Sequence, residues 1–309
     1  MPVFNEIQRI DRCISSLEKQ DADFRCVISD NKSTDGTFEL VRERINKDSR
    51  FHLVRTLEHT SIISNSDNAL EHALQLGIES DYMMFFAGDD TLISNNYLSA
   101  LSLWLDQNDT FNVVSPTIEM FNYSTKAIWE INPSLESRSP FLRVLKWGLK
   151  NSSSGFTNFI CGLMRRDTYL ELQKNNRKNW NFENKGTSAR SIRSEFVTFT
   201  QFVIASRIGN CSKVVLQKEI HNRTPSGGRV DNSQSIAETR GFIYNFVHQM
   251  RSISIPFRAL KLFHKELGIQ ELSMLGLFSF LYFSTNFLSL LKKKSSQIFA
   301  NLVSSKGRN

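Results

Sequence analysis

Short apolar runs alternate with amphipathic stretches over the first 116 residues of the chain. The runs at residues 25–29, 51–55 and 82–86 have the length and composition of buried strands. Around them, apolar residues recur at helical spacing in three stretches, each with one apolar face. Strands that alternate with helices in this way indicate βαβ units and a mainly parallel sheet, so we expect an α/β fold.

The pattern extends further along the chain, although less regularly. It predicts a helix over residues 95–106 and a strand over residues 111–115. Later, helical spacing returns at residues 194–204 and 238–250, with a predicted strand at residues 213–217 between them. The second half of the chain is therefore also expected to mix helices with strands.

A long apolar segment lies near the end of the chain. Residues 272–291 carry no charge and many Leu and Phe, and three lysines follow at 292–294. The length is that of a membrane span, about 20 residues, but one glycine, one asparagine and several hydroxyl side chains weaken that interpretation. Amphipathic helices with Lys-rich flanks favour anionic lipid headgroups. We expect residues 256–294 to attach the protein to a membrane surface, with a true span or a helix packed on the domain or on a second subunit as alternatives.

The net charge of +7 is unevenly distributed. Residues 1–110 carry ten Lys and Arg against nineteen Asp and Glu, whereas residues 111–309 carry 28 against twelve. An acidic half suits a bound cation, and a basic remainder suits an anionic partner. Nucleic acid is not the expected partner, because the aromatic residues do not alternate with the basic ones.

Cysteine usage and the first residues bear on the compartment. The four cysteines are far apart and form no CxxC pair, so neither a zinc site nor a disulfide framework is indicated. A reducing cytosol suits such residues. The charged N-terminal residues do not have the pattern of a signal peptide. We expect a cytoplasmic protein that is peripheral at the inner face of the plasma membrane.

Candidate chemistry lies at the predicted strand ends. Asp30 follows the strand at 25–29, and Asp89 and Asp90 follow the strand at 82–86. Parallel sheets bind ligands at the carboxyl ends of their strands. Hard cations such as Mg²⁺ and Mn²⁺ take carboxylate oxygens. The alternative is that the aspartate pair only caps the next turn, but its place in an acidic α/β half favours a metal site.

Four blocks of sequence resemble, in order, the motifs of the inverting glycosyltransferases of family 2, which have the GT-A fold. They are residues 2–6, 26–37, 65–69 and 85–90. The resemblance implies a Rossmann-like, mainly parallel sheet flanked by helices. It also implies transfer of a sugar, with inversion, from a nucleotide-diphospho-sugar to a hydroxyl of a glycan or lipid-linked acceptor. A divalent cofactor, Mn²⁺ or Mg²⁺, and a role in cell-surface polysaccharide synthesis are expected.

The resemblance also implies which residues form the donor site. Asp89 is the expected metal ligand, and His221, in a basic loop with two glycines, is a second candidate. In the same loop, Arg223 is a candidate for contacts with a phosphate. The residues expected to bind the nucleotide sugar are Pro2, Phe4, Glu6, Asp30, Asn31, Ser33, Asp35, Asn68 and Asp90.

An inverting transfer needs a general base to take the proton of the acceptor hydroxyl. The family places this carboxylate on a helix after the metal site, where this chain has Glu195. A solvated glutamate in the first turn of a helix is the alternative. Arg165 and Arg166 are candidates for phosphate or acceptor contacts, because guanidinium groups match phosphate oxygens. They could equally be a surface pair balanced by Asp167 and Glu171.

Two departures from the family pattern change these expectations. Ala87 replaces an aspartate that is common two residues before the metal ligand, so we expect modest metal affinity. Few residues precede Phe4, so we expect a short first strand, and either a start further upstream or a frayed sheet edge. The expected regions are a nucleotide-sugar-binding half at 1–120, an acceptor-binding half at 121–235 and a helical, basic C-terminal extension at 236–309.

Two other functions compete with sugar transfer. A sugar nucleotidyltransferase has the same layout, but the chain lacks a glycine-rich basic loop near its N-terminus that would grip a triphosphate. A non-catalytic protein that binds a nucleotide sugar or a membrane partner is suggested by Ala87 and by the lone Glu195. A homo-oligomer is left open, as are the sugar, the nucleotide and the acceptor.

Overall fold

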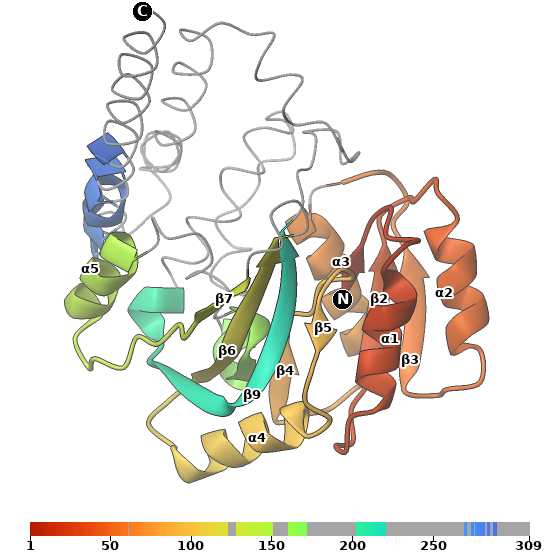
Figure 1. The fold of residues 1–309 in the computed structure, drawn as a ribbon, viewed down its shortest axis with the longest axis horizontal. Helices are drawn as coiled ribbons and strands as arrows, with labels where there is room; N and C mark the ends of the chain where they lie inside the picture. The colour runs from red at the N-terminus through yellow and green to blue at the C-terminus, as the bar shows by residue number, and fades with distance from the viewer. Residues whose placement is uncertain are drawn as a thin grey trace, which may run out of the picture.

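The computed structural model of the chain describes residues 1–60, 62–122, 128–150, 160–171 and 202–220, with a few residues between 269 and 288. In these parts the chain folds into helices and strands that alternate along the first half and mix in the second, as Figure 1 shows. This confirms the expected α/β fold.

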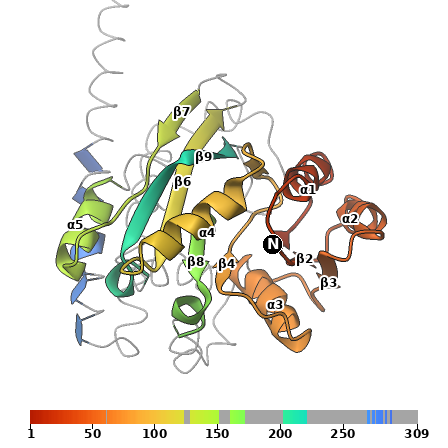
Figure 2. The ribbon, with the colours of Figure 1, turned by 90° about the horizontal axis from the view of Figure 1, so that it is seen from below.

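The first half has the predicted β/α order. Three of its strands, β1, β2 and β3, form a parallel sheet in that order. Figure 2 shows α1 and α2 on one face of this sheet and α3 on the other. After α3, Gly77 has a φ of 66°, the left-handed conformation in which glycine carries no steric penalty. The elements are β1 (Pro2–Val3), α1 (Ile10–Glu18), β2 (Cys26–Asp30), α2 (Thr37–Ile45), β3 (Phe51–Arg55), α3 (Ile62–Gln75) and β4 (Tyr82–Met84).

A second sheet contains β4 and the later strands, in the order β4-β8-β6-β9-β5, with β7 paired to β6. In this sheet β6 and β9 are parallel, whereas β4/β8, β6/β8, β6/β7 and β5/β9 are antiparallel. The expected parallel sheet is therefore the one that β1, β2 and β3 form. The link from β6 to β7 is too short for the crossover of about a dozen residues that parallel neighbours need. The elements are β5 (Thr91–Leu92), α4 (Tyr97–Gln107), β6 (Val113–Asn122), β7 (Ile128–Ile131), α5 (Pro140–Lys150), β8 (Leu163–Arg165) and β9 (Ile208–Ile220).

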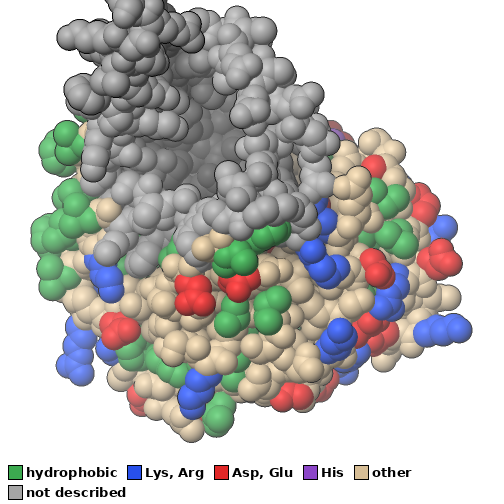
Figure 3. Space-filling view, viewed as in Figure 1, with side chains coloured by type: hydrophobic (Ala, Val, Ile, Leu, Met, Phe, Trp, Pro, Cys, Tyr) green, Lys and Arg blue, Asp and Glu red, His purple; other side chains and the backbone are tan. Residues whose placement is uncertain are grey.

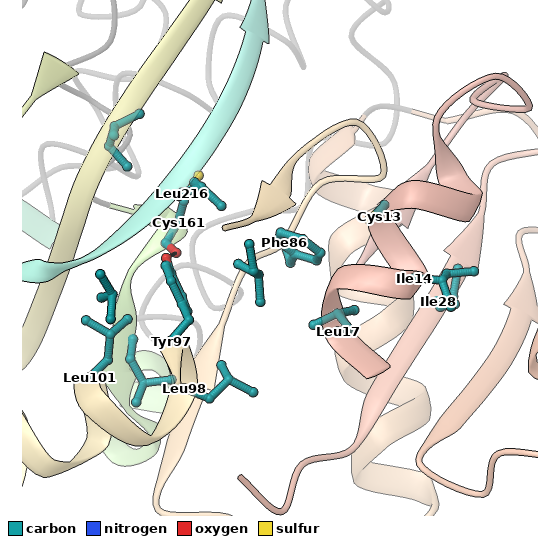
Figure 4. Packing of buried hydrophobic residues seen from close by; sticks show 14 of the residues in the cluster. Cys13, Ile14, Leu17, Ile28, Phe86, Tyr97, Leu98, Leu101, Cys161 and Leu216 are labelled. Carbon is teal, nitrogen blue, oxygen red and sulfur yellow. Dashed lines mark hydrogen bonds between the residues drawn. The ribbon is translucent and has the colours of Figure 1, made fainter. Parts of the chain in front are cut away.

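One hydrophobic core joins the two sheets. Side chains of α1, of the β4–β5 segment, of α4 and of β9 contribute to it, as Figure 4 shows for Phe86, Tyr97 and Leu216. Gly162 lies so close to β6 that a Cβ atom would stand 2.0 Å from the carbonyl oxygen of Val114. The chain can approach β6 here only because the residue is a glycine. This close approach brings Cys161 near Asp90, which forms an acidic pair with Asp89 on the turn between β4 and β5.

A second hydrophobic cluster involves the predicted apolar segment. Phe278 is fully buried, and its ring stacks on that of Trp147 in α5 with centroids 3.9 Å apart. Phe280 and Leu288 of the same segment are exposed. None of the helices in the described residues is both long and apolar enough to cross a membrane. The described part of the segment therefore packs on the domain at Phe278 and leaves apolar side chains outside.

Candidate functional site

Two loops that follow β1 and β2 are held together by side chains from the first two sequence blocks. The backbone N–H of Asn5 donates to the Ser33 hydroxyl at 3.0 Å, and the N–H of Thr34 donates to Oδ1 of Asn5 at 2.9 Å. Asn5 and Lys32 both have positive φ, near 55° and 60°. The left-handed conformation turns each loop sharply at the end of its strand. Ser33, a predicted site residue, thus shapes the site.

Asp35 and Glu6 also bind the loops to each other. The Asp35 carboxylate accepts from the backbone N–H of Thr37, at 3.0 Å, and from that of Ile7, at 3.2 Å. The N–H of Glu6 donates to the Thr37 hydroxyl at 2.8 Å, and its carboxylate forms a buried ion pair with Arg9. Through these contacts Glu6 and Asp35, both predicted site residues, hold the two loops together at the carboxyl ends of β1 and β2.

Asp30 is the last residue of β2, and its carboxylate is fully buried. Oδ2 accepts from the Ser33 N–H at 3.1 Å and lies 3.0 Å from Nε of Arg55. Oδ1 is also buried, and no described residue donates to it. A buried carboxylate oxygen with no donor is costly, so Asp30 is poised to accept a hydrogen bond from a ligand.

An aromatic side chain lies beside Asp30. Pro2 and Val3 pair with β2, with Val3 opposite Asp30, so Phe4 leaves the strand next to that carboxylate. The Phe4 ring is half-buried and 4.5 Å from the His59 ring, centroid to centroid. The Phe4 ring and the Asp30 carboxylate therefore offer a flat apolar surface and a hydrogen-bond acceptor side by side, at the carboxyl ends of β1 and β2.

Asn31 and Asn68 hold the segments around this edge. The Asn31 amide donates to the Thr60 carbonyl and accepts from the Thr60 N–H, both at 2.8 Å, which closes the loop after β3. Asn68, on α3, donates to the Ser29 hydroxyl at 2.8 Å. Ser29 in turn donates to Asn65. In the described contacts, Asn31 and Asn68 bind protein groups and position β2.

The acidic pair lies on the turn between β4 and β5. Asp89 is half-buried, whereas Asp90 is 1% exposed. The missing Cβ of Gly88 faces Val3, whose Cγ1 atom would be 2.7 Å away. The glycine therefore brings the acidic turn against β1, next to Phe4 and Asp30.

The Asp90 carboxylate is bound by Lys218 of β9. The Lys218 ammonium lies 2.9 Å from Oδ1 and 2.8 Å from Oδ2 of Asp90. Burial by itself lowers the pKa of Lys218, but the Asp90 carboxylate outweighs this and raises it. The ammonium stays charged and neutralises Asp90. Asp89 is the more exposed carboxylate of the pair.

The thiol of Cys161 is a second neighbour of the Asp90 carboxylate, with Sγ 3.9 Å from Oδ2. Burial raises its pKa to about 12, so the thiol stays protonated and acts as a weak donor. Asp90 is thus fixed by a cation and a thiol inside the protein.

The described residues supply only part of the ligand set that a hard cation such as Mg²⁺ or Mn²⁺ needs. Within the described residues, no three His, Cys, Asp or Glu side chains cluster as a metal site would need. Asp89 supplies one carboxylate, and Mg²⁺ or Mn²⁺ is often held by one or two carboxylates with the phosphates of a substrate. Such a cation, held by Asp89 and by the donor, would neutralise charge on the diphosphate.

Arg165 is the last residue of β8 and Arg166 follows it, and the two lie away from the acidic turn. β8 is antiparallel to β4, so Arg165 pairs with Tyr82 at the end of β4 opposite to the acidic turn. Its guanidinium donates to the carbonyls of Leu105 and Phe111. The backbone N–H of Arg166 donates to the Asp81 carbonyl. The structure does not bring Arg165 and Arg166 to Asp89, which argues against their predicted contact with a phosphate of the donor.

The remaining predicted residues, Glu195, His221 and Arg223, lie outside the described residues. Lys218, by contrast, is a site residue that sequence reasoning missed. It directly follows the predicted strand at 213–217, but its partner Asp90 is 128 residues earlier in the chain. No local motif links residues that far apart. Arg55, which contacts Asp30, was missed for the same reason.

Comparisons with known proteins identify the fold and the family of the chain. No curated protein matches the chain. The chain resembles the crystal structure of residues 1–349 of S. aureus TarS, with a TM-score of 0.54, 16% identity, and coverage of 92% of this chain and 70% of the other. The same TarS fragment in complex with UDP-GlcNAc gives a TM-score of 0.51 at 15% identity, covering 92% of this chain and 71% of that one.

At such low identity, these likenesses establish the fold, which is GT-A. The family comes from the sequence itself. The model described as "Glycosyl transferase family 2" matches residues 1–172, which is more than half of the chain and contains both Asp30 and the acidic pair. The chain therefore belongs to glycosyl transferase family 2.

Proposed function

We propose that the protein transfers a sugar, with inversion, from a uridine diphosphate sugar to a hydroxyl of a glycan or lipid-linked acceptor. The observation that carries the nucleotide part is Asp30, whose buried Oδ1 atom receives no hydrogen bond from any described residue. The N–H on the edge of a uracil ring is the donor that this oxygen lacks. The half-buried Phe4 ring next to it suits the face of the base.

The structures of TarS support the choice of nucleotide. One of them holds UDP-GlcNAc. For this chain the same class of donor is our proposal, and the identity of the sugar is left open. With the base at Asp30, the diphosphate would extend along the sheet edge toward the acidic turn, because Gly88 packs against Val3 and so places that turn beside β1.

The chemical step follows from the leaving group. The acceptor oxygen attacks the anomeric carbon as the bond from that carbon to the phosphate oxygen breaks, and UDP leaves with the bonding electrons. The hydroxyl proton passes to a carboxylate, for which Glu195 remains our candidate. Asp89 would hold the cation that neutralises the departing diphosphate, with His221 and Arg223 as further candidates at the donor.

Replacing Asp30 by asparagine is expected to weaken UDP binding by about 10-fold or more, the effect of losing one hydrogen bond to a charged acceptor. The asparagine oxygen can keep the contacts of Oδ2 with Ser33 and Arg55. Its NH₂ group then stands where Oδ1 stood and faces the base with a donor. Isothermal titration calorimetry with UDP measures the change.

Asp21→Asn is a matched control, because Asp21 is an exposed aspartate that lies on the chain just before β2. It should leave the affinity for UDP unchanged. Equal UDP affinity in wild type and Asp30→Asn, with both folded by circular dichroism, would contradict the assignment of Asp30 to the base.

We also propose that the protein works at a membrane surface, in the synthesis of a cell-surface polysaccharide. Large apolar side chains are exposed on α5 at Phe141, Leu142 and Leu149. Figure 3 shows hydrophobic side chains along the left edge of the molecule, the side on which Figure 1 shows α5. Since Phe278 packs on α5, the exposed Phe280 belongs to the same region.

Vesicle flotation tests the membrane proposal. The protein is expected to bind vesicles that contain an anionic lipid and to be released by high salt, which screens surface charge. Replacing the lysines at 292–294 by glutamine should weaken binding about 100-fold, since each lysine near an anionic surface contributes about 1 kcal/mol. The exposed Lys19, Lys47 and Lys213, replaced together, form the control. Equal binding to neutral and anionic vesicles would contradict the electrostatic attachment.

A further inference from the structure

Lys218 occupies a core-facing position on β9. Leu216, two residues before it and therefore on the same face of the strand, is fully buried. Pairing on both sides fixes the strand, because β5 pairs with β9 up to Gln217 and Lys218 itself pairs with Met120 of β6. A lysine in such a position is costly unless its charge is paired. The strand thus holds the ammonium at one place, beside the acidic turn.

The Lys218 ammonium contacts both oxygens of Asp90, at 2.9 Å from Oδ1 and 2.8 Å from Oδ2. An ammonium in this geometry stands where a cation bound by both oxygens of that carboxylate would stand. Asp90 is 1% exposed, whereas the Lys218 side chain is 24% exposed, so the lysine is the member of the pair that reaches solvent. A divalent cation can therefore bind both oxygens of Asp90 only by displacing Lys218.

The other carboxylate of the acidic turn, that of half-buried Asp89, also acts on this lysine. Burial lowers the pKa of Lys218, but the charge of Asp90 and, more weakly, that of Asp89 raise it. Two carboxylates and one ammonium give this cluster of three side chains a charge of −1. The affinity of a site for a hard cation follows the number of its charged ligands. With Asp90 bound by Lys218, the cluster is a weak cation site until the diphosphate of the donor adds its oxygens.

We propose that Lys218 is a positioning residue of the donor site, which withholds Asp90 from the cation and so makes cation binding depend on the donor. Mn²⁺ or Mg²⁺ then enters the site together with the diphosphate and not before it. This role rests on the proposed function, in which the cation lies between Asp89 and the diphosphate. An order of binding follows, because the cation completes its ligand set only when the donor is present.

Titration of the protein with Mn²⁺, followed by the electron paramagnetic resonance of the free ion, tests this role directly. After correction for the Mn²⁺ that UDP binds in solution, wild type should bind Mn²⁺ about 10-fold or more tightly with UDP than without it. Without UDP, Lys218→Gln should bind Mn²⁺ about 10-fold more tightly than wild type, because both carboxylates can then serve as ligands. Lys218→Arg keeps a cation on Asp90 and should bind as weakly as wild type. Equal affinity of wild type and Lys218→Gln would overturn the proposal.

Thermal unfolding separates this role from that of an ion pair that only stabilises the fold. Lys218→Met leaves the buried Asp90 carboxylate without its cation from β9. Mn²⁺ without nucleotide should then raise the Tm of this variant by about 4 °C or more, because the ion binds the native state. The same Mn²⁺ concentration should shift wild type, and the control Lys218→Met with Asp90→Asn, by less than about 1 °C. A Tm of Lys218→Met that Mn²⁺ does not raise would show a purely structural ion pair.

Asp89→Asn, measured beside these variants, distinguishes failure of this role from failure of the proposed cation site. If Asp89→Asn binds Mn²⁺ with UDP as tightly as wild type does, the cation does not lie at Asp89, and both the proposed cation site and the role of Lys218 are wrong. If Asp89→Asn loses this binding while Lys218→Gln behaves as wild type, the cation site stands and the role of Lys218 alone is overturned. Loss in Asp89→Asn with a gain in Lys218→Gln is the result that we expect.

Discussion

Replacing Asp89 by asparagine is expected to lower the rate of sugar transfer about 100-fold or more, since a cation at the leaving group contributes several kcal/mol. Asparagine has the same shape but no charge, so the site would lose the carboxylate of Asp89, while Asp90 stays bound by Lys218. Release of UDP from a UDP-sugar, measured with and without Mn²⁺, gives the rate. The variant should also lose the Mn²⁺-dependent part of UDP binding in calorimetry.

Asp81→Asn is the control for this experiment. Asp81 is exposed and lies just before β4, at the end opposite to the acidic turn. It should keep wild-type rates. An Asp89→Asn protein that is folded and as fast as wild type in Mn²⁺ would remove Asp89 from the cation site.

Replacing Lys218 by methionine is expected to lower Tm by roughly 5–10 °C, corresponding to about 3 kcal/mol. The Asp90 carboxylate is 0% exposed, and Lys218 contacts both of its oxygens. Without the ammonium, Asp90 is left as a buried charge with no cation from β9. The Lys218 side chain is 24% exposed, so the effect falls at the low end of the range for buried ion pairs. Differential scanning calorimetry measures the shift.

The double variant Asp90→Asn with Lys218→Met provides the control, because it removes the buried carboxylate that has lost its cation from β9 in the single variant. It should recover more than half of the lost Tm, and the cycle then reports the coupling between the two residues. A single Lys218→Met variant that melts within about 1 °C of wild type would show that the ion pair contributes little to stability.

The sequence predicted those parts of the site that depend on local patterns. Asp30 could be placed at a strand end because apolar residues directly precede it, and the structure makes it the last residue of β2. The acidic pair was placed after the strand at 82–86, and it follows β4 on a tight turn.

What the sequence could not predict depends on pairing between distant segments. Periodicity shows that a strand is buried but not which strand lies beside it, so the antiparallel pairs of the second sheet were missed. Arg165 was a candidate for phosphate or acceptor contacts because of its residue type, whereas the register of β8 on β4 places it at the end of β4 opposite to the acidic turn. The contact of Lys218 with Asp90 likewise exists only because β9 lies next to β5 in the second sheet.

The most direct measurement is binding and turnover of a panel of nucleotide-diphospho-sugars by wild-type protein, in Mn²⁺ and in EDTA. Our account predicts that a uridine diphosphate sugar binds and releases UDP and that EDTA reduces this release. Guanosine donors should bind more weakly, because guanine presents two adjacent N–H donors where, in the described contacts, only Oδ1 of Asp30 lacks one. Binding of a uridine donor with no turnover on any acceptor would favour a non-catalytic protein. Failure to bind any nucleotide sugar in either condition would contradict the central claim.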